Sequence, residues 1–335
     1  MVNNIINAAV HDLQRGPQGF KIVQGQDKLI VTHTVQRVIN ELHDLYARRA
    51  SKSYGKFSDQ LTYSETKTYL GDYLAVGPDG FADLTAKMMV TLQNSARTRN
   101  AAAGGHVFFA HFERDNHQYL LVAIITDKLG ANLTGNLDVQ DVVHLDVDGF
   151  RFAGRINMTA WLDQQERYIG FLKGKGSVSE YFKEFLGCDT VIQARQDTSQ
   201  LVETLKEFTL QKQMSAADRE EFLTKAKGIC ERLASSQREI DFEEFANELF
   251  PSAPAELSEV LGSPERKLND GFIPDRRALV PLKKFKGKTS SWSVEFDRQA
   301  LTDGSIIFDA DANTLTFKGL PVELAMELKR ETIDE

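Results

Sequence analysis

The chain has 335 residues, of which 41% are hydrophobic and 26% charged, and its formal net charge is −8. This length allows two domains with hydrophobic cores, and the composition is ordinary for a soluble globular protein. The acidic balance excludes a histone-like coat of positive charge, so a surface for nucleic acid would have to be a local cationic patch.

The first part of the chain predicts short strands and long helices. The N-terminus lacks a basic stretch followed by an apolar one, so no signal peptide is expected. Strands are expected at Phe20–Val23 and Leu29–Thr32, and apolar residues at helical spacing predict helices that begin at Thr34 and Asp79. No apolar run reaches about 18 residues, which argues against a membrane-spanning helix.

Two strands, His106–Glu113 and Gln118–Asp127, are separated by four polar residues, which predicts an antiparallel hairpin. The spacing of the histidines in this region is irregular, and no cysteine or convergent carboxylate accompanies them. The two cysteines of the chain are far apart and form no Cys-x-x-Cys pair, which is typical of reduced cytosolic thiols. We therefore expect no metal site and no cofactor.

The stretch HLDVDGFRF places Asp146 and Asp148 on one face of an expected strand. Paired carboxylates could bind Mg²⁺ in a nuclease. A two-metal site also needs further acids and usually a nearby lysine, and no such set follows at a recognisable spacing. A hairpin turn at Asp148-Gly149 is the better interpretation, and the nuclease stays as an alternative.

Tyr168–Leu172 is a short apolar run rich in aromatic and β-branched residues, which predicts a strand buried on both faces. It ends at Lys173-Gly174-Lys175-Gly176. Ser177–Glu180 then has capping-box spacing, which predicts the start of a helix. Gly187 is well placed to end that helix in a left-handed conformation.

A strand, a loop of lysines and glycines and a helix N-terminus together suit a phosphate, because glycines let the backbone approach and helix N–H groups point at the anion. The loop does not match the Gly-x-x-x-x-Gly-Lys-Ser/Thr pattern, and Glu180 would repel an anion, so a nucleotide site is not expected. A nucleic-acid backbone tolerates looser geometry. A glycine turn with solvated lysines is the alternative. The candidate phosphate contacts are Lys173, Gly174, Lys175 and Ser177.

The pattern Tyr-x-x-Phe-Leu-Lys-Gly-x-x-x-Val-x-x-x-Phe-x-x-Phe-Leu-Gly, from Tyr168 to Gly187, resembles the bacterial nucleoid-associated protein family of the NdpA/YejK type. Further stretches match that family in the same order: Tyr54-Gly55-x-Phe57-Ser58, Tyr119–Ala123, Asn136-Leu137-Asp138, Leu145-Asp146 and Thr314–Gly319. The resemblance covers nearly the whole chain. It implies a cytoplasmic protein that associates with the nucleoid and binds duplex DNA, and it supplies no catalytic residues.

Helices are expected to continue after this stretch, with starts at Ser215 and Asp241. Pro251–Pro264 is a break in composition that carries a short helix. Towards the C-terminus, strands are expected at Ile306–Asp309 and Thr314–Lys318, followed by a last helix. The acidic residues between these two strands imitate the start of an EF-hand loop but lack its glycine and its bidentate glutamate, so a turn is expected.

The segment Arg276–Lys288 is the most basic of the chain, with six cations and no acid: Arg276, Arg277, Lys283, Lys284, Lys286 and Lys288. Ala278–Leu282 predicts a strand, with lysines at its exit and in the loop before a second strand at Trp292–Phe296. A hairpin with a cationic loop is one form that readers of duplex DNA use. A solvated turn is the alternative, but six cations without an acid in an acidic chain favour contact with phosphates.

Together these patterns predict an α+β protein. Its expected parts are a mixed N-terminal domain over residues 1–165, a strand and four-helix unit over 166–250, and a basic, strand-rich C-terminal region over 265–335. The predicted function is non-catalytic binding of double-stranded DNA on the nucleoid, with no membrane partner. A nuclease using Asp146 and Asp148 and an adaptor for a DNA-processing protein remain alternatives. A homodimer would double a small cationic patch.

Overall fold

The computed structural model describes residues 3–17, 19–60, 65–99, 102, 104–150, 152–173 and 180–332. The chain divides into two compact units. The first takes in Met1–Gln193, Ile240–Asn247 and Ser252–Phe272, and the second takes in Ala194–Glu239, Glu248–Pro251 and Ile273–Glu335. The large antiparallel sheet of the first unit and the helices and small sheets of both units confirm the predicted α+β class.

The first unit is built on an eight-stranded antiparallel sheet with the order β10-β3-β9-β8-β5-β4-β1-β2. Its strands are β1 (Asn4–Gly16), β2 (Gly19–Val23), β3 (Lys52–Phe57), β4 (Gly105–Arg114), β5 (His117–Ile125), β8 (Phe152–Asn157), β9 (Ile169–Leu172) and β10 (Cys188–Thr190). Every residue of β9 is buried, which confirms the strand predicted at Tyr168–Leu172.

The hairpin of β4 and β5 is confirmed by its register, in which Arg114 lies opposite His117. The two residues between them, Asp115 and Asn116, have positive φ angles of 51° and 62°. Asp and Asn tolerate this left-handed conformation, which a two-residue turn between twisted strands requires.

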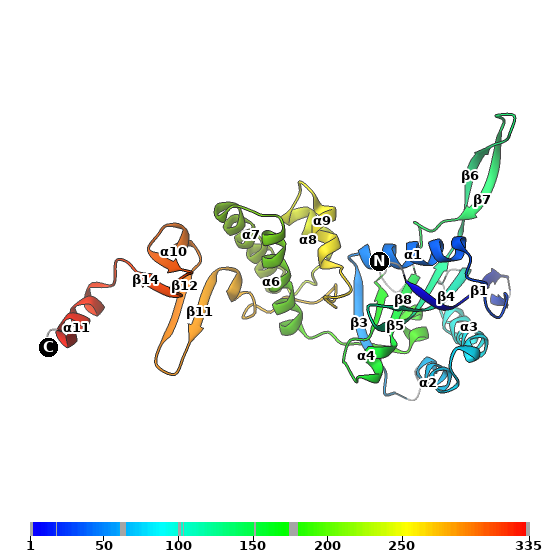
Figure 1. Cartoon of the computed structure of the whole chain (residues 1–335), viewed down its shortest axis with the longest axis horizontal. Helices are drawn as coiled ribbons and strands as arrows, with labels where there is room; N and C mark the ends of the chain where they lie inside the picture. The colour runs from blue at the N-terminus through cyan, green and yellow to red at the C-terminus, as the bar shows by residue number, and fades with distance from the viewer. Residues whose placement is uncertain are drawn as a thin grey trace. The chain divides into compact units, whose positions relative to one another are not determined.

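Helices cover both faces of the sheet, as Figure 1 shows for α1 (His33–Arg48) on one side and α3 (Phe81–Arg97) on the other. Alternate residues of β5 belong to two separate hydrophobic clusters: Leu120, Val122 and Ile124 to one, and Leu121, Ala123 and Ile125 to the other. This alternation is the expected signature of a strand buried on both faces. The remaining helices with residues in this unit are α2 (Thr66–Val76), the 3₁₀ helix η1 (Pro78–Gly80), α4 (Met158–Leu162), α5 (Glu180–Leu186), α8 (Phe242–Leu249) and α9 (Pro254–Leu261).

One strand predicted in this unit is wrong, and one predicted helix start cannot be compared with the structure. Leu29–Thr32 forms no strand, because Thr32 caps α1 by accepting a hydrogen bond from the Val35 N–H. The predicted helix start at Ser177 lies outside the described residues. Gly187, with a φ of 66°, ends α5 as predicted.

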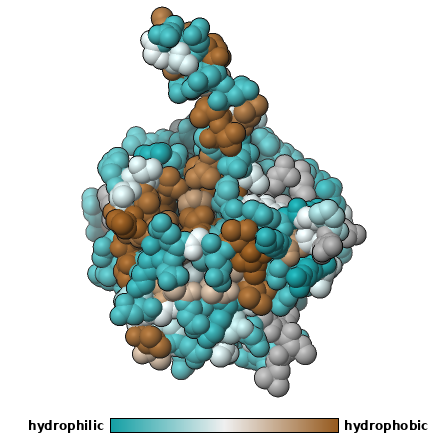
Figure 2. Space-filling model, turned by 90° about the vertical axis from the view of Figure 1, so that its right-hand side faces the viewer, coloured by the Kyte–Doolittle hydropathy of each residue, from teal (hydrophilic) through white to brown (hydrophobic). Residues whose placement is uncertain are grey.

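An arm of two strands, β6 (Asp127–Leu133) and β7 (Val139–Leu145), forms a separate sheet. Because β7 pairs with β6 and β8 pairs with β5 and β9, the predicted hairpin turn at Asp148-Gly149 is wrong: this segment connects the arm to the large sheet. Leu129 lies opposite Val143 on the arm, and both side chains are more than 60% exposed. Figure 2 shows such apolar side chains along the arm where it rises from the body of the unit.

The second unit combines helices with two small hairpins. Its helices are α6 (Ala194–Gln211), α7 (Ala216–Ser235), η3 (Val280–Leu282), α10 (Gln299–Thr302) and α11 (Val322–Thr332), and its strands are β11 (Lys284–Lys288), β12 (Ser293–Asp297), β13 (Ile306–Asp309) and β14 (Thr314–Phe317). Ser215 caps α7 as predicted, since its hydroxyl accepts from the Asp218 N–H at 3.1 Å. Stacked rings of Phe208 and Phe222, 5.7 Å apart, join α6 to α7.

The strand predicted at Ala278–Leu282 is wrong, because this segment forms turns and η3. The Asp275 carboxylate accepts hydrogen bonds from the N–H groups of Arg277 and Ala278, which fixes a turn at the start of the segment. Proline then stands near the start of η3, where its missing N–H costs no hydrogen bond. The predicted turn between β13 and β14 is confirmed, with Asp309 accepting from two N–H groups of the loop.

Candidate nucleic-acid interface

The lysine and glycine loop after β9 is described only at its first residue. Lys173 is half-buried, and its backbone pairs with Ser51: its N–H donates to the Ser51 carbonyl at 3.0 Å, and its carbonyl accepts from the Ser51 hydroxyl at 3.2 Å. Gly174, Lys175 and Ser177 lie outside the described residues. The loop therefore remains a sequence-based candidate.

The basic segment of the second unit forms a hairpin of β11 and β12, with its lysines inside a strand rather than in the loop alone. Lys284 lies opposite Asp297, Lys286 opposite Glu295 and Lys288 opposite Ser293. Alternate residues of a strand point to one face, so the three lysines share it. We call this the lysine face and define it by Lys284, Lys286 and Lys288. Lys286 and Lys288 are exposed, and Lys284 is half-buried.

A carboxylate lies among these lysines. Glu295 accepts a hydrogen bond from the Lys284 ammonium at 2.9 Å, and its second oxygen is 3.5 Å from the Lys286 ammonium. The hydrogen bond and charge of Lys284, with a smaller effect of Lys286, lower the pKa of Glu295, so this carboxylate is ionised at neutral pH. The sequence analysis considered only the run of residues without an acid and missed Glu295, which the pairing of the two strands places opposite Lys286.

The opposite face of the hairpin is apolar and anchored. Phe285 and Phe296 pack with their ring centroids 5.5 Å apart, and Phe296 meets Phe317 of β14 edge to face at 6.3 Å. The Arg298 guanidinium lies 4.3 Å from the centre of the Phe285 ring and 3.6 Å from the Glu220 carboxylate of α7. Because these contacts hold one face of the hairpin against the unit, the lysine face points outward.

The other cations of the segment lie beside the hairpin. The Arg276 guanidinium donates to the Ser235 hydroxyl, and the side chains of Arg277 and Lys283 are exposed. Across the ranges that the structure describes, Arg276, Arg277, Lys283 and Lys288 have no carboxylate within ion-pair distance. Four of the six predicted cations are thus available to an anion without breaking an ion pair.

Sequence reasoning also missed Trp292 at the tip of this hairpin. The Thr289 hydroxyl accepts from the Trp292 N–H at 3.1 Å and helps to close the turn, while the indole remains 54% exposed. Tryptophan presents a large apolar surface with one polar atom, which suits a binding surface. The sequence could have indicated this residue, because it is an aromatic residue directly after a polar loop.

The residues of the alternative nuclease site do not form a metal cluster. Asp146 follows the end of β7, and its carboxylate lies 3.9 Å from the Lys128 ammonium, while the backbone carbonyl of Asp148 accepts from Arg49 at 2.9 Å. Within the described part of the chain, no three histidine, cysteine or acidic side chains are grouped so that they could hold a metal ion. None of the helices in those ranges has the length and apolar composition that crossing a membrane requires.

Comparisons with known proteins cover almost the full chain. The family model described as nucleoid-associated protein YejK matches residues 9–325. A nucleoid-associated protein of Azotobacter vinelandii is 26% identical, with 97% of this chain and 98% of the relative aligned. Nucleoid-associated protein YejK of Shigella flexneri is 28% identical, and that of Escherichia coli O1:K1 is also 28% identical, with 98% of both chains aligned in each case.

Proposed function

The chain belongs to the nucleoid-associated protein YejK family, and from this premise we propose that it binds the phosphate backbone of duplex DNA through the hairpin of its second unit. A nucleoid-associated protein works at the nucleoid, which bacteria keep in the cytoplasm. The observation that carries the proposal is the lysine face, which is exposed on a hairpin whose other face is fixed by aromatic packing. A rigid cationic strand can follow phosphates without reading bases.

The proposed binding is local and independent of sequence. An acidic chain repels DNA at long range, so attraction has to come from cations gathered at one place. Arg276, Arg277 and Lys283 adjoin the lysine face in sequence, and their side chains add charge without forming an ion pair to any carboxylate in the described part of the chain. Binding to phosphates by such groups needs no bond-breaking step, and we propose that the role is non-catalytic.

We expect the affinity for duplex DNA to fall steeply with salt. Each cation that neutralises a phosphate releases a counterion, so the slope of log K against log salt is about −0.9 for each contact. Engagement of the four cations without a carboxylate predicts a slope of about −4, and engagement of all six predicts about −5. Fluorescence anisotropy with labelled duplexes of unrelated sequence measures the slope, which should be the same for each. A slope close to zero, or strong preference for one sequence, would contradict backbone binding by this hairpin.

Replacing Glu295 by glutamine should tighten DNA binding about three- to tenfold. The carboxylate holds Lys284 and Lys286, and phosphates have to displace it, at the small cost that is typical of ion pairs exposed to solvent. Anisotropy titrations at low salt would measure the gain. Glu327→Gln on α11 makes the same change in charge away from the hairpin and serves as the control. If both substitutions tighten binding equally, the change in net charge explains the gain, and the result contradicts binding by the lysine face.

A further inference from the structure

The C-terminal end of the second unit leaves a series of large apolar side chains in water. Residues 307–331, which take in most of β13, all of β14 and most of α11, are exposed except for the half-buried Ala325. The nine large apolar residues of this stretch are between 38% and 69% exposed, with Leu315 and Val322 at the two extremes. Soluble chains rarely leave so much apolar surface along one stretch unless something binds there.

The apolar face of the β13–β14 hairpin starts in the core of the unit and runs outward. Ile306 lies opposite Phe317, and Phe308 lies opposite Leu315. Directly opposed residues and every second residue along a strand share one face, so these four side chains do. Ile306 is only 7% exposed and Phe317 meets Phe296 of β12, whereas Phe308 is 52% exposed. The core therefore covers one end of this face and leaves the other end in water.

Helix α11 has a broad apolar side and a charged side. An isolated helix of 11 residues is marginal in water even when its composition favours helix, and an isolated two-stranded hairpin is marginal as well. Both elements therefore need a partner over their apolar sides. At 3.6 residues per turn, the apolar side of α11 consists of Val322, Leu324, Ala325, Met326 and Leu328.

The exposed apolar surface is about as large as one dimer interface requires. At roughly 100–200 Å² for a fully exposed apolar side chain, the exposed fractions leave roughly 400–800 Å² in water on each chain. A stable interface of standard size takes about 800 Å² from each partner, roughly three-fifths of it apolar. A single partner surface is therefore enough to cover the stretch.

The charges of α11 favour a second copy of the chain as that partner. Glu323 lies in the first turn of the helix and Arg330 in the last. Because residues seven positions apart fall on nearly the same side of a helix, both lie along one edge of the apolar side, next to Met326. Two copies of α11 that pack antiparallel bring Glu323 of each chain beside Arg330 of the other. The contact is then self-complementary, as a two-fold axis requires.

A membrane surface fits α11 less well than a second copy does. Amphipathic helices that lie on membranes carry mainly lysine and arginine on their polar side. Helix α11 instead has three acids and two bases, so anionic headgroups and nucleic-acid phosphates both repel it.

We propose that two copies of this chain form a homodimer through the apolar side of α11, packed antiparallel, and the exposed end of the β13–β14 hairpin. The lysine face lies on a different hairpin, that of β11 and β12, so the proposal stands whether or not this face binds DNA. Each chain keeps its own lysine face in the dimer. The dimer therefore presents two lysine faces in place of one.

Analytical ultracentrifugation of the full chain, in the absence of DNA, tests the proposal. We expect the native chain to shift from monomer to dimer as its concentration rises. The double variant Leu324→Asp and Leu328→Asp should raise the dissociation constant of the dimer at least about 100-fold, because it removes two leucines from the interface. The matched control, Leu129→Asp with Leu133→Asp, changes two leucines of the β6–β7 arm that are at least as exposed, and it should leave the dimer unchanged.

Reversal of charge at the edge of α11 keeps the test decisive if the double variant folds poorly. Glu323→Arg and Arg330→Glu should each weaken the dimer about tenfold when studied alone, because each places like charges side by side at two equivalent positions. An equal mixture of the two variants should regain the native affinity, since each arginine then meets a glutamate of the partner. The mixture contains the same molecules that associate poorly alone, so a change in helix stability cannot explain the recovery.

Three results would overturn the proposal. A native chain that stays monomeric at every concentration would assign the apolar stretch to a different protein. A dimer that the α11 variants leave intact, or that the arm variants weaken as much, would place the contact elsewhere. Charge variants that associate no better together than alone would contradict the antiparallel packing of α11.

Discussion

Replacing Lys284, Lys286 and Lys288 together by glutamate should weaken binding to duplex DNA about 10²–10³-fold at roughly 50 mM salt. The substitution removes three cations from one face of β11 and places three carboxylates against the phosphates. It should act alike on every DNA sequence, because phosphate contacts carry no base information. The slope of log K against log salt should also become shallower by about 3. Anisotropy titrations at several salt concentrations measure both effects.

The matched control changes the formal charge equally at another place. Lys21, Lys56 and Lys67 are exposed lysines of the first unit, and their replacement by glutamate keeps the lysine face intact. We expect this variant to lose little affinity. Because the lysine face is mostly solvent-exposed, both variants should keep the circular dichroism spectrum of the native chain. If the two triple variants lose the same affinity, overall charge rather than the hairpin governs binding.

Local signals in the sequence predicted local structure well. The four polar residues Arg114–His117 between two apolar runs predicted an antiparallel hairpin, and the register of β4 and β5 confirms it. Ser215 was predicted as a helix start from the hydrogen bond that its hydroxyl can make, and that bond is present. Such features depend on residues a few positions apart, so no knowledge of the tertiary fold is needed.

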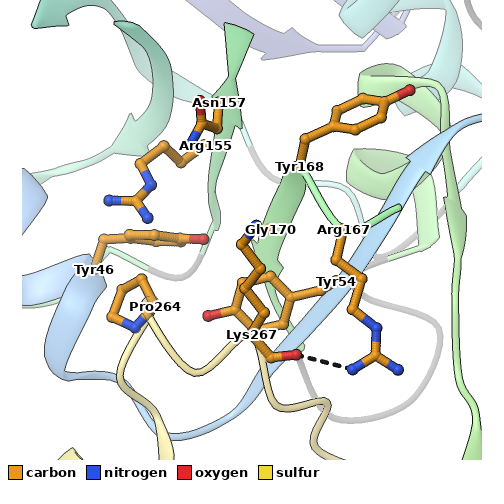
Figure 3. A pocket seen from close by; sticks show the side chains of 9 residues that line it. All are labelled: Tyr46, Tyr54, Arg155, Asn157, Arg167, Tyr168, Gly170, Pro264 and Lys267. Atoms are coloured by element: carbon orange, nitrogen blue, oxygen red, sulfur yellow. Dashed lines mark hydrogen bonds between the residues drawn. The ribbon is translucent and has the colours of Figure 1, made fainter. Parts of the chain in front are cut away.

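Contacts between residues that are far apart in the sequence were harder to predict. The acid-free run that ends at Lys288 suggested an unopposed cationic surface, but β12 brings Glu295 beside two of its lysines. The arm of β6 and β7 was missed because its exposed apolar residues imitate a strand of the core. The small cavity lined by Gly170 (Figure 3) could not be predicted either, because Tyr46, Arg155 and Lys267, which also line it, come from three distant parts of the chain. These failures share one cause, because the tertiary fold determines which strands pair and which distant residues meet.

Lys52 is a further residue that the sequence did not single out, and its loss should have the largest effect on stability. This lysine opens β3 and is 0% exposed. Its ammonium donates to the carbonyls of Ala47 at 3.0 Å and Gly262 at 2.6 Å, and also to that of Arg49. One cation thus satisfies carbonyls at the ends of α1 and α9, where helix dipoles favour positive charge. Gly262 makes the approach possible, since a Cβ atom there would lie 2.5 Å from the Arg49 carbonyl oxygen.

Lys52→Met should therefore lower the free energy of unfolding by about 3–5 kcal/mol, because three carbonyls lose their donor and each costs about 1–3 kcal/mol when buried without one. Urea unfolding at pH 7 measures the loss in the unit that contains β3. Lys56→Met changes an exposed lysine of the same strand and should alter stability by less than about 0.5 kcal/mol.

The pH dependence of the Lys52 effect has a definite sign. Burial, and then the charge of Arg155, lower the pKa of Lys52 from 10.5 to about 7 in the folded chain. Between these two values the unfolded chain binds more protons than the folded chain, so this group makes stability rise with pH. The difference in unfolding free energy between the native chain and Lys52→Met should be smallest below pH 7 and grow as the pH rises towards 10. A difference that stays constant across this range would mean that the ammonium keeps its proton, held by the three carbonyls.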